Sequence, residues 1–202
     1  MIHKLKHAGY ERIVVNVHHF AGQIVDYLKA NDNFGLDIRI SDESDMLLET
    51  GGGIKKALPL FDPTEPILIH NVDILSNLDL TALPTDAPLL VVSQRQTKRY
   101  LLFDDDMRLQ GWTNIETGEV KSPYPSLDPT DLKQLAFSGI HVIWPRLFPL
   151  FMEMPERFGI IDFYLKYCHQ YAFLGLEKKD LRLMDVGKLD SLDEAENFIS
   201  NI

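Results

Sequence analysis

Residues 12–41 read RIVVNVHHFAGQIVDYLKANDNFGLDIRIS, and this stretch has the clearest alternation of strand and helix patterns in the chain. Its first six residues are rich in β-branched side chains, which predicts a short buried strand. Apolar residues then recur at helical spacing across 20–30, and an alternating apolar and polar run at 36–41 predicts a second strand. A strand, a helix and a strand in this order are typical of a βαβ unit with parallel strands.

The same alternation continues along the chain on both sides of this stretch. A short helix is expected at 2–8, and another helix is expected after the glycines at 51–53, ending at about Leu60. Buried strands are expected at 66–71 and 88–92 because both segments are short, apolar and bounded by turn residues. The sequence therefore predicts an α/β protein with a mostly parallel sheet.

The middle of the chain has a different character. Short strands separated by turn residues predict a β-meander or hairpin insert at about 99–125. Further elements are expected after it: strands at 134–143, 172–176 and 181–184, and helices at 145–152, 160–169 and 191–199, the last with Asp190 or Ser191 as N-cap. Because no linker or repeat interrupts the pattern, we expect a single domain over 1–202.

Composition and charge exclude several classes of protein. Thirty acidic against twenty basic residues give a net charge of −10, which disfavours a nucleic-acid partner. The same charge argues weakly against a phosphorylated ligand unless a divalent cation lies between the acids and the phosphates. No apolar stretch approaches the roughly 20 residues that cross a bilayer, so no membrane partner is expected. The N-terminus does not have the pattern of a signal peptide, and Cys168 is the single cysteine. Both features favour a cytoplasmic protein.

Glu49 and Thr50 precede three consecutive glycines, Gly51, Gly52 and Gly53. Glycine is a poor residue inside a helix or strand, so we expect a turn between a strand and a helix. Such a turn lets a ligand approach the backbone and leaves free N–H groups at the helix start, which suits a phosphate or a flat base. A flexible turn without a ligand explains the run equally well.

Asn71, Val72 and Asp73 follow the apolar run ILIH. A carboxylate at the carboxyl end of a parallel strand lies at the edge where α/β folds bind ligands. Such an acid can hold Mg²⁺, which prefers oxygen ligands. The alternative is that Asp73 begins an Asx turn or caps a helix.

Asp185 and Gly187 follow the predicted strand at 181–184 in the same way. Both aspartates can reach one edge of a sheet, where two carboxylates and phosphate oxygens would complete a Mg²⁺ site. Asp185 could instead cap the helix at 191–199, although Asp190 and Ser191 already suit that role.

Five segments resemble the sugar-phosphate nucleotidyltransferase family, in the branch of the N-acetylmuramate 1-phosphate uridylyltransferases and mannose-1-phosphate guanylyltransferase-like proteins. These segments are GYERIVVNVHHFAGQIVDYL (9–28), LLETGGGIKKALPLF (47–61), PILIHNVDIL (66–75), LAFSGIHVI (135–143) and MDVGKLDSLDEAENF (184–198). The resemblance implies a Rossmann-like three-layer fold of the glycosyltransferase-A type with a mixed, mostly parallel sheet. It also implies transfer of a nucleoside monophosphate from a nucleoside triphosphate to a sugar 1-phosphate, with release of pyrophosphate.

The resemblance also implies roles for individual residues. Asp73 and Asp185 would act in catalysis by holding Mg²⁺. The segment formed by Glu49, Thr50, Gly51 and Gly52 would lie against the nucleotide base. Asn71 would face the substrates, and the backbone of Gly139 would approach the sugar.

Two features depart from the family pattern. Val72 stands where the family usually has a small residue such as glycine. The family's first strand, with its glycine-rich loop carrying arginine and lysine, has no counterpart, so we expect an N-terminally truncated domain. The alternative function is therefore an inactive or non-catalytic module that binds a nucleotide sugar. A missing central strand would also expose sheet edges through which two copies could pair.

Overall fold

The computed structural model describes residues 1–187 and 192–200, and these residues form two compact units. Unit 1 comprises residues 1–65, 80–82 and 144–163. Unit 2 comprises residues 66–79 and 83–143 and the chain from 164 onward. The expectation of a single domain stays a prediction. None of the helices in the described ranges combines the length and the apolar character that a bilayer-crossing segment needs.

Unit 1 contains the βαβ unit expected from the opening stretch. Strand β1 (Arg12–Val17) and strand β2 (Asp37–Asp42) pair in parallel, and helix α2 (Ala21–Ala30) connects them. The predicted strand at 36–41 is thus displaced by one residue. The β-branched residues of β1 favour the extended conformation, and Val17 is buried.

The remaining elements of unit 1 are mostly short helices. They are α1 (Ile2–His7), η1 (Asp32–Gly35), α3 (Glu49–Ala57), η2 (Leu58–Leu60), η4 (Pro145–Leu147), α4 (Phe148–Met152) and the first half of α5 (Ile160–Tyr167). Phe151 of α4 stacks on Phe163 of α5, with ring centroids 4.0 Å apart. Both rings are fully buried and form the centre of the unit's core.

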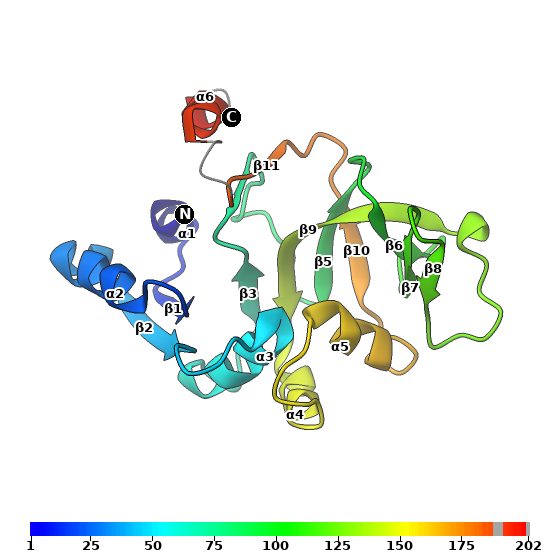
Figure 1. Ribbon diagram of the computed structural model, residues 1–202, viewed down its shortest axis with the longest axis horizontal. Coiled ribbons are helices and arrows are strands. Elements are labelled where there is room, and N and C mark those ends of the chain that lie inside the picture. The colour runs from blue at the N-terminus through cyan, green and yellow to red at the C-terminus, as the bar shows by residue number, and fades with distance from the viewer. Residues whose placement is uncertain (188–191, 201–202) are drawn as a thin grey trace. The chain divides into compact units, whose positions relative to one another are not determined.

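Unit 2 is built on β9 (Lys133–Ile143), which lies between β3 (Ile67–His70) and β5 (Leu89–Ser93) in Figure 1. Both neighbours run antiparallel to β9. The other strands of this sheet are β6 (Arg99–Phe103), β7 (Leu109–Asn114), β8 (Glu119–Lys121) and β10 (Leu174–Glu177). The sheet is mixed, as expected. Parallel pairing among the described strands is nevertheless limited to β1–β2 and β5–β10, because β9 runs against the strands beside it.

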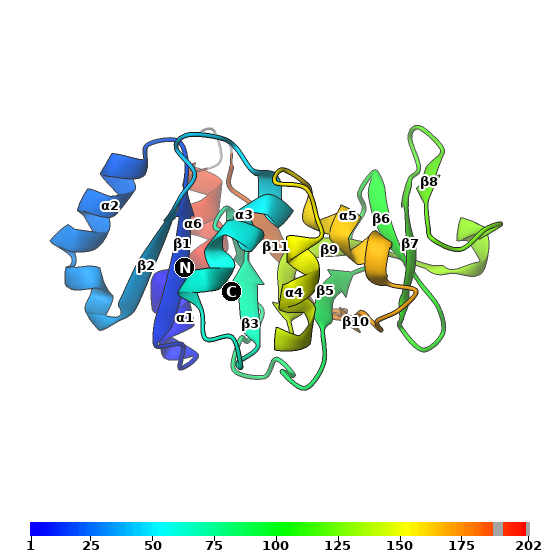
Figure 2. The ribbon, with the colours of Figure 1, turned by 90° about the horizontal axis from the view of Figure 1, so that it is seen from below.

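The predicted hairpin insert forms as three consecutive antiparallel strands, β6, β7 and β8, which Figure 2 shows side by side. A separate ribbon of unit 2 joins β4 (Ile74–Ser76) to β11 (Leu183–Asp185) in antiparallel orientation. Strand β4 was not expected from the sequence. The last helix is α6 (Leu192–Ser200), and its predicted N-cap at Asp190 or Ser191 lies outside the described residues.

Candidate functional site

Asp73 and Asp185 meet in unit 2, and we call them the acid pair. Asp73 lies in the turn after β3, and Asp185 is the last residue of β11. The β4–β11 ribbon pairs Asp185 with Ile74, and the N–H of Val186 donates a 2.8 Å hydrogen bond to the carbonyl of Asp73. The two segments are distant in sequence, so this ribbon is what brings the two carboxylates together.

The carboxylates of the acid pair both lie close to Gly187. A Cβ added to Gly187 would lie 3.2 Å from Oδ1 of Asp185 and 3.3 Å from Oδ2 of Asp73. One atom-sized position is therefore within reach of both carboxylates, and only the lack of a side chain keeps it open. The Gly187 N–H also donates to Oδ1 of Asp185 at 2.9 Å, which orients that carboxylate.

The acid pair fits a hard divalent cation. Mg²⁺ usually takes one or two protein carboxylates and completes its shell with water and phosphate oxygens. No group of three or more histidine, cysteine, aspartate or glutamate side chains with metal-binding geometry occurs in residues 1–187 and 192–200. In the described part of the chain, the acid pair would therefore supply two carboxylates to such a cation.

Asn71 and Gly139 lie in the same unit as the acid pair and contact each other. The N–H of Asn71 donates to the carbonyl of Gly139 at 3.1 Å, where the paired part of β3 ends. Gly139 has φ +75°, and a Cβ there would lie 2.7 Å from Nδ2 of Asn71. Glycine is therefore required at this bend of β9 both by its backbone conformation and by the close approach of the amide.

Val72 stands between Asn71 and Asp73, and its side chain is 80% exposed. The departure from the small residue of the family pattern thus places an apolar side chain on the surface of the turn that carries Asp73. It does not prevent the contacts of the two neighbouring residues.

The three glycines of unit 1 are not a turn, and this expectation was wrong. Helix α3 begins at Glu49 and contains all of Gly51, Gly52 and Gly53, which are buried. The N–H groups of Gly51 and Gly52 both donate to the carbonyl of Phe158, at 2.9 and 3.1 Å, so they are not free for a phosphate. The glycines are needed because the 156–158 segment packs directly on the helix.

Distances to that segment show why side chains are excluded from this face of α3. A Cβ on Gly51 would lie 2.3 Å from the ring of Phe158, and a Cβ on Gly52 would lie 2.3 Å from the carbonyl oxygen of Glu156. The glycines were expected to let a ligand approach the backbone closely. In this structure a close approach does occur, but it is made by the 156–158 segment of the chain.

Glu49 and Thr50 contact the same region of unit 1. Nε and Nη2 of Arg157 donate to Oε1 of Glu49 at 3.0 and 2.9 Å. Oγ1 of Thr50 accepts a hydrogen bond from the N–H of Ile160 at 3.0 Å. Both side chains are exposed, and Glu49 has a positive φ of 62°, which is uncommon for a residue with a side chain.

Unit 1 contains a buried acid that was not expected from the sequence. Glu43 follows β2, is only 5% exposed, and its Oε1 accepts a hydrogen bond from Nδ2 of Asn16 at 2.5 Å. A Cβ on Gly53 would lie 2.6 Å from the same oxygen, so the third glycine of α3 makes room for this carboxylate. The run SDES around Glu43 is polar and predicts a surface loop, so no local signal marks the residue as buried.

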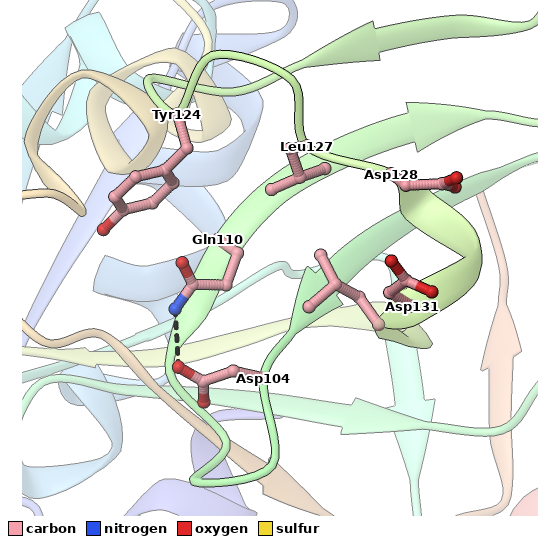
Figure 3. A pocket seen from close by; sticks show the side chains of 7 residues that line it. Asp104, Gln110, Tyr124, Leu127, Asp128 and Asp131 are labelled. Carbon is pink, nitrogen blue, oxygen red and sulfur yellow. Dashed lines mark hydrogen bonds between the residues drawn. The ribbon is translucent and has the colours of Figure 1, made fainter.

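An open hollow of about 320 Å³ lies elsewhere in unit 2, beside the β6–β8 strands. Figure 3 shows the side chains that line it, which are Asp104, Gln110, Tyr124, Leu127, Asp128, Asp131 and Leu132. Nε2 of Gln110 donates to Asp104 at 2.6 Å, and Asp128 accepts the N–H of Thr130 at 2.9 Å. These two carboxylates stabilise their own turns, and none of the predicted site residues lies here.

Comparison with known proteins supports the resemblance predicted from the sequence. The chain is 42% identical over 79 residues to an N-acetylmuramate α-1-phosphate uridylyltransferase of Neisseria meningitidis, a match that covers 39% of this chain and 34% of the relative. It is 31% identical over 153 residues to the protein of the same name from Caulobacter vibrioides, covering 73% of this chain and 62% of the relative. The chain is thus similar in sequence to two N-acetylmuramate α-1-phosphate uridylyltransferases.

A solved structure shows that the similarity extends from the sequence to the fold. The structure is of a putative glucose-1-phosphate thymidylyltransferase from Bacillus anthracis; it matches with a TM-score of 0.76 at 13% identity and covers 100% of this chain and 81% of that chain. The predicted Rossmann-like nucleotidyltransferase fold is therefore confirmed. No known protein-family profile matches the sequence. The match spans about a third of the Neisseria uridylyltransferase and somewhat under two thirds of the Caulobacter one.

Proposed function

We propose that this protein transfers a nucleoside monophosphate from a nucleoside triphosphate to a sugar 1-phosphate, giving a nucleotide sugar and pyrophosphate. The observation that carries this proposal is the convergence of Asp73 and Asp185 on the open position at Gly187. In the reaction, a phosphate oxygen of the sugar 1-phosphate attacks the α-phosphorus, and the bond from that phosphorus to the pyrophosphate group breaks. Catalysis of this kind depends on positioning and on neutralising charge more than on proton transfer.

The acid pair would hold Mg²⁺, whose charge would offset the negative charge of the phosphate groups. The chain's own contribution is to orient its groups. Asp185 is held by the Gly187 N–H, and the backbone of Asp73 is held by Val186. Without a cation, the acid pair and the net charge of −10 would repel both phosphorylated substrates.

We assign the sugar side of the site to Asn71 and Gly139. The Asn71 side chain offers both a donor and an acceptor, the combination that sugar hydroxyl groups require. The backbone of Asn71 is held by the hydrogen bond that its N–H donates to the carbonyl of Gly139. Gly139 lets the Asn71 amide lie close against the backbone of β9, because that amide fills the space that a side chain at 139 would take.

We assign contact with the nucleotide base to the segment Glu49–Gly52. The N–H groups of Gly51 and Gly52 already donate to Phe158. Oε1 of Glu49 accepts from Arg157 and Oγ1 of Thr50 accepts from Ile160. We therefore assign the base contacts to the second carboxylate oxygen of Glu49 and to the hydroxyl hydrogen of Thr50, on these exposed side chains.

Two further proposals concern the cellular location and the self-association of the protein. We propose a cytoplasmic location, consistent with the single cysteine. We also propose self-association through a sheet edge. Among the described strands, β1 pairs only with β2 and β3 only with β9, which leaves one edge of each without a strand partner.

Pyrophosphate release in the presence of Mg²⁺ tests the proposed activity. The names of the two relatives make UTP and N-acetylmuramate α-1-phosphate the first pair to assay, followed by other triphosphates and sugar 1-phosphates. Asp73→Ala should reduce turnover by about 10²-fold or more, because it removes one of two groups that would hold the cation. Asp106→Ala, in the exposed tip of the β6–β7 turn, is the matched control and should retain activity.

Two results would count against the enzyme. Turnover that is equal in the wild type and in Asp73→Ala would place the chemistry elsewhere. No turnover with any substrate pair, together with calorimetric binding of a nucleotide sugar, would favour the non-catalytic module.

A further inference from the structure

The register of the β4–β11 ribbon decides whether the acid pair forms. The ribbon has only three residue pairs, the last of which joins Asp185 to Ile74. Successive side chains of a strand point to opposite faces, so a slip of one residue would turn Asp185 away from Asp73. A two-stranded ribbon is marginally stable by itself. Contacts outside the three pairs must therefore fix its register.

Asn77 provides such contacts at the end of the ribbon that is remote from the acid pair. Its Nδ2 donates to the carbonyl of Asp180 at 3.0 Å, and its Oδ1 accepts from the N–H of Arg182 at 2.8 Å. Its own N–H donates to the carbonyl of Arg182 at 3.2 Å. One residue thus binds three backbone groups of the segment that leads into β11.

The chemistry of the amide makes this contact specific for one register. A carboxamide presents its donor and its acceptor in a fixed relation, so both bonds form only when the carbonyl and the N–H of the other strand are correctly placed. After a slip of one residue, neighbouring residues would lie opposite Asn77, and their N–H and carbonyl groups point to the other side of the strand. The opposite end of the ribbon is held by the hydrogen bond from Val186 to Asp73.

We propose that Asn77 is a positioning residue for the acid pair, because it fixes the register that places the Asp185 carboxylate opposite Asp73. Asn77 acts through the ribbon and does not itself touch the cation. This inference rests on the proposed function, since it concerns the same Mg²⁺ site.

The first measurement uses Mn²⁺ as the probe and follows free Mn²⁺ by electron paramagnetic resonance during titration. Asn77→Leu keeps the number and branching of the side-chain heavy atoms and removes both side-chain hydrogen bonds. It should weaken Mn²⁺ binding by about tenfold or more, the size of effect found when groups that orient metal ligands are removed. Asn114→Leu is the matched control, because Asn114 is also half-buried in unit 2 and its Oδ1 caps a turn by accepting the N–H of Glu116. The control should bind Mn²⁺ like the wild type.

The second measurement is hydrogen exchange of the backbone N–H groups at 182–186 without metal. Asn77→Leu should speed their exchange while leaving the N–H groups of β5 and β9 protected. Asn77→Ala serves as a second variant if the leucine disturbs folding.

The outcomes separate this proposal from the proposed function. If the wild type binds Mn²⁺ and Asp73→Ala does not, but Asn77→Leu binds normally, the role of Asn77 is overturned and the metal site stands. Faster exchange with unchanged Mn²⁺ affinity also overturns it, because Asn77 is then only structural. If the wild type does not bind Mn²⁺, or binds it no better than Asp73→Ala, the metal site fails and the role of Asn77 fails with it.

Discussion

At the scale of single residues, an absent side chain leaves room between the two carboxylates of the acid pair. A Cβ on Gly187 would contact oxygens of both aspartates at 3.2 and 3.3 Å. A methyl group there would occupy the position that both carboxylates can reach. It would also offer no hydrogen-bond donor to either of them.

Gly187→Ala should therefore weaken Mn²⁺ binding by roughly tenfold or more, with little effect on folding, because the residue is exposed. Calorimetric titration of Mn²⁺ measures the first effect, and urea denaturation measures the second. Gly22→Ala is the control, since nothing lies within 4 Å of a Cβ at Gly22 in α2. Equal Mn²⁺ affinity in Gly187→Ala and the wild type would mean that the cation does not lie between the two carboxylates.

At the scale of elements, α3 shows how packing overrides helix propensity. Three glycines in one helix each cost about 1 kcal/mol relative to alanine, which is why the sequence predicted a turn. The helix forms because its glycine face lets the 156–158 segment approach and lets Gly51 and Gly52 donate to Phe158. Neither contribution is visible in a local window, since the partner lies about a hundred residues away.

Gly52→Ala tests this packing. Alanine has the better helix propensity, but its Cβ would lie 2.3 Å from the carbonyl oxygen of Glu156, a backbone atom that cannot move cheaply. We expect a net loss of about 1–3 kcal/mol in the free energy of unfolding, measured in urea. Gly22→Ala has open space in α2 and should instead stabilise the protein by a few tenths to about 1 kcal/mol. If Gly52→Ala is also stabilising, α3 does not pack on this segment in solution.

At the scale of the whole molecule, a buried histidine links stability to pH. His141 of β9 is almost fully buried and hydrogen-bonds through Nδ1 to the hydroxyl of Tyr164. Burial, and then the charge of His70, lower the pKa of His141 from 6.5 to about 3. The unfolded chain therefore binds a proton between pH 6.5 and 3 that the folded chain does not, and stability falls as the pH drops through this window.

We expect the free energy of unfolding to fall by up to a few kcal/mol across that range because of His141 alone. His141→Gln cannot titrate, so the pH profiles of the variant and the wild type should converge as the pH falls towards 3. Urea denaturation at several pH values measures the difference. Nuclear magnetic resonance of the wild type gives a direct check, and a His141 signal that titrates near pH 6.5 would contradict the burial.

Much of the fold could be predicted from local patterns. The strands β1, β3, β5 and β9 and the β6–β8 insert were predicted close to their observed bounds, because period-two and β-branched runs are properties of neighbouring residues. Strand β4 was not predicted, because three residues are too few to carry a pattern. The antiparallel direction of β9 was not predicted either, since strand direction depends on partners that no short window contains.

Local sequence patterns predicted most of the helices and strands and the residue types that could bind a cation, because side-chain chemistry and periodicity act between near neighbours. The folded chain was needed to show that Asp73 and Asp185 approach one position, that helix α3 contains three glycines, and that Glu43 is buried. Each of these outcomes depends on pairing between distant segments. In such pairing, many contacts together set the register of a strand or the distance between two backbone segments, so these features cannot be predicted from any single residue.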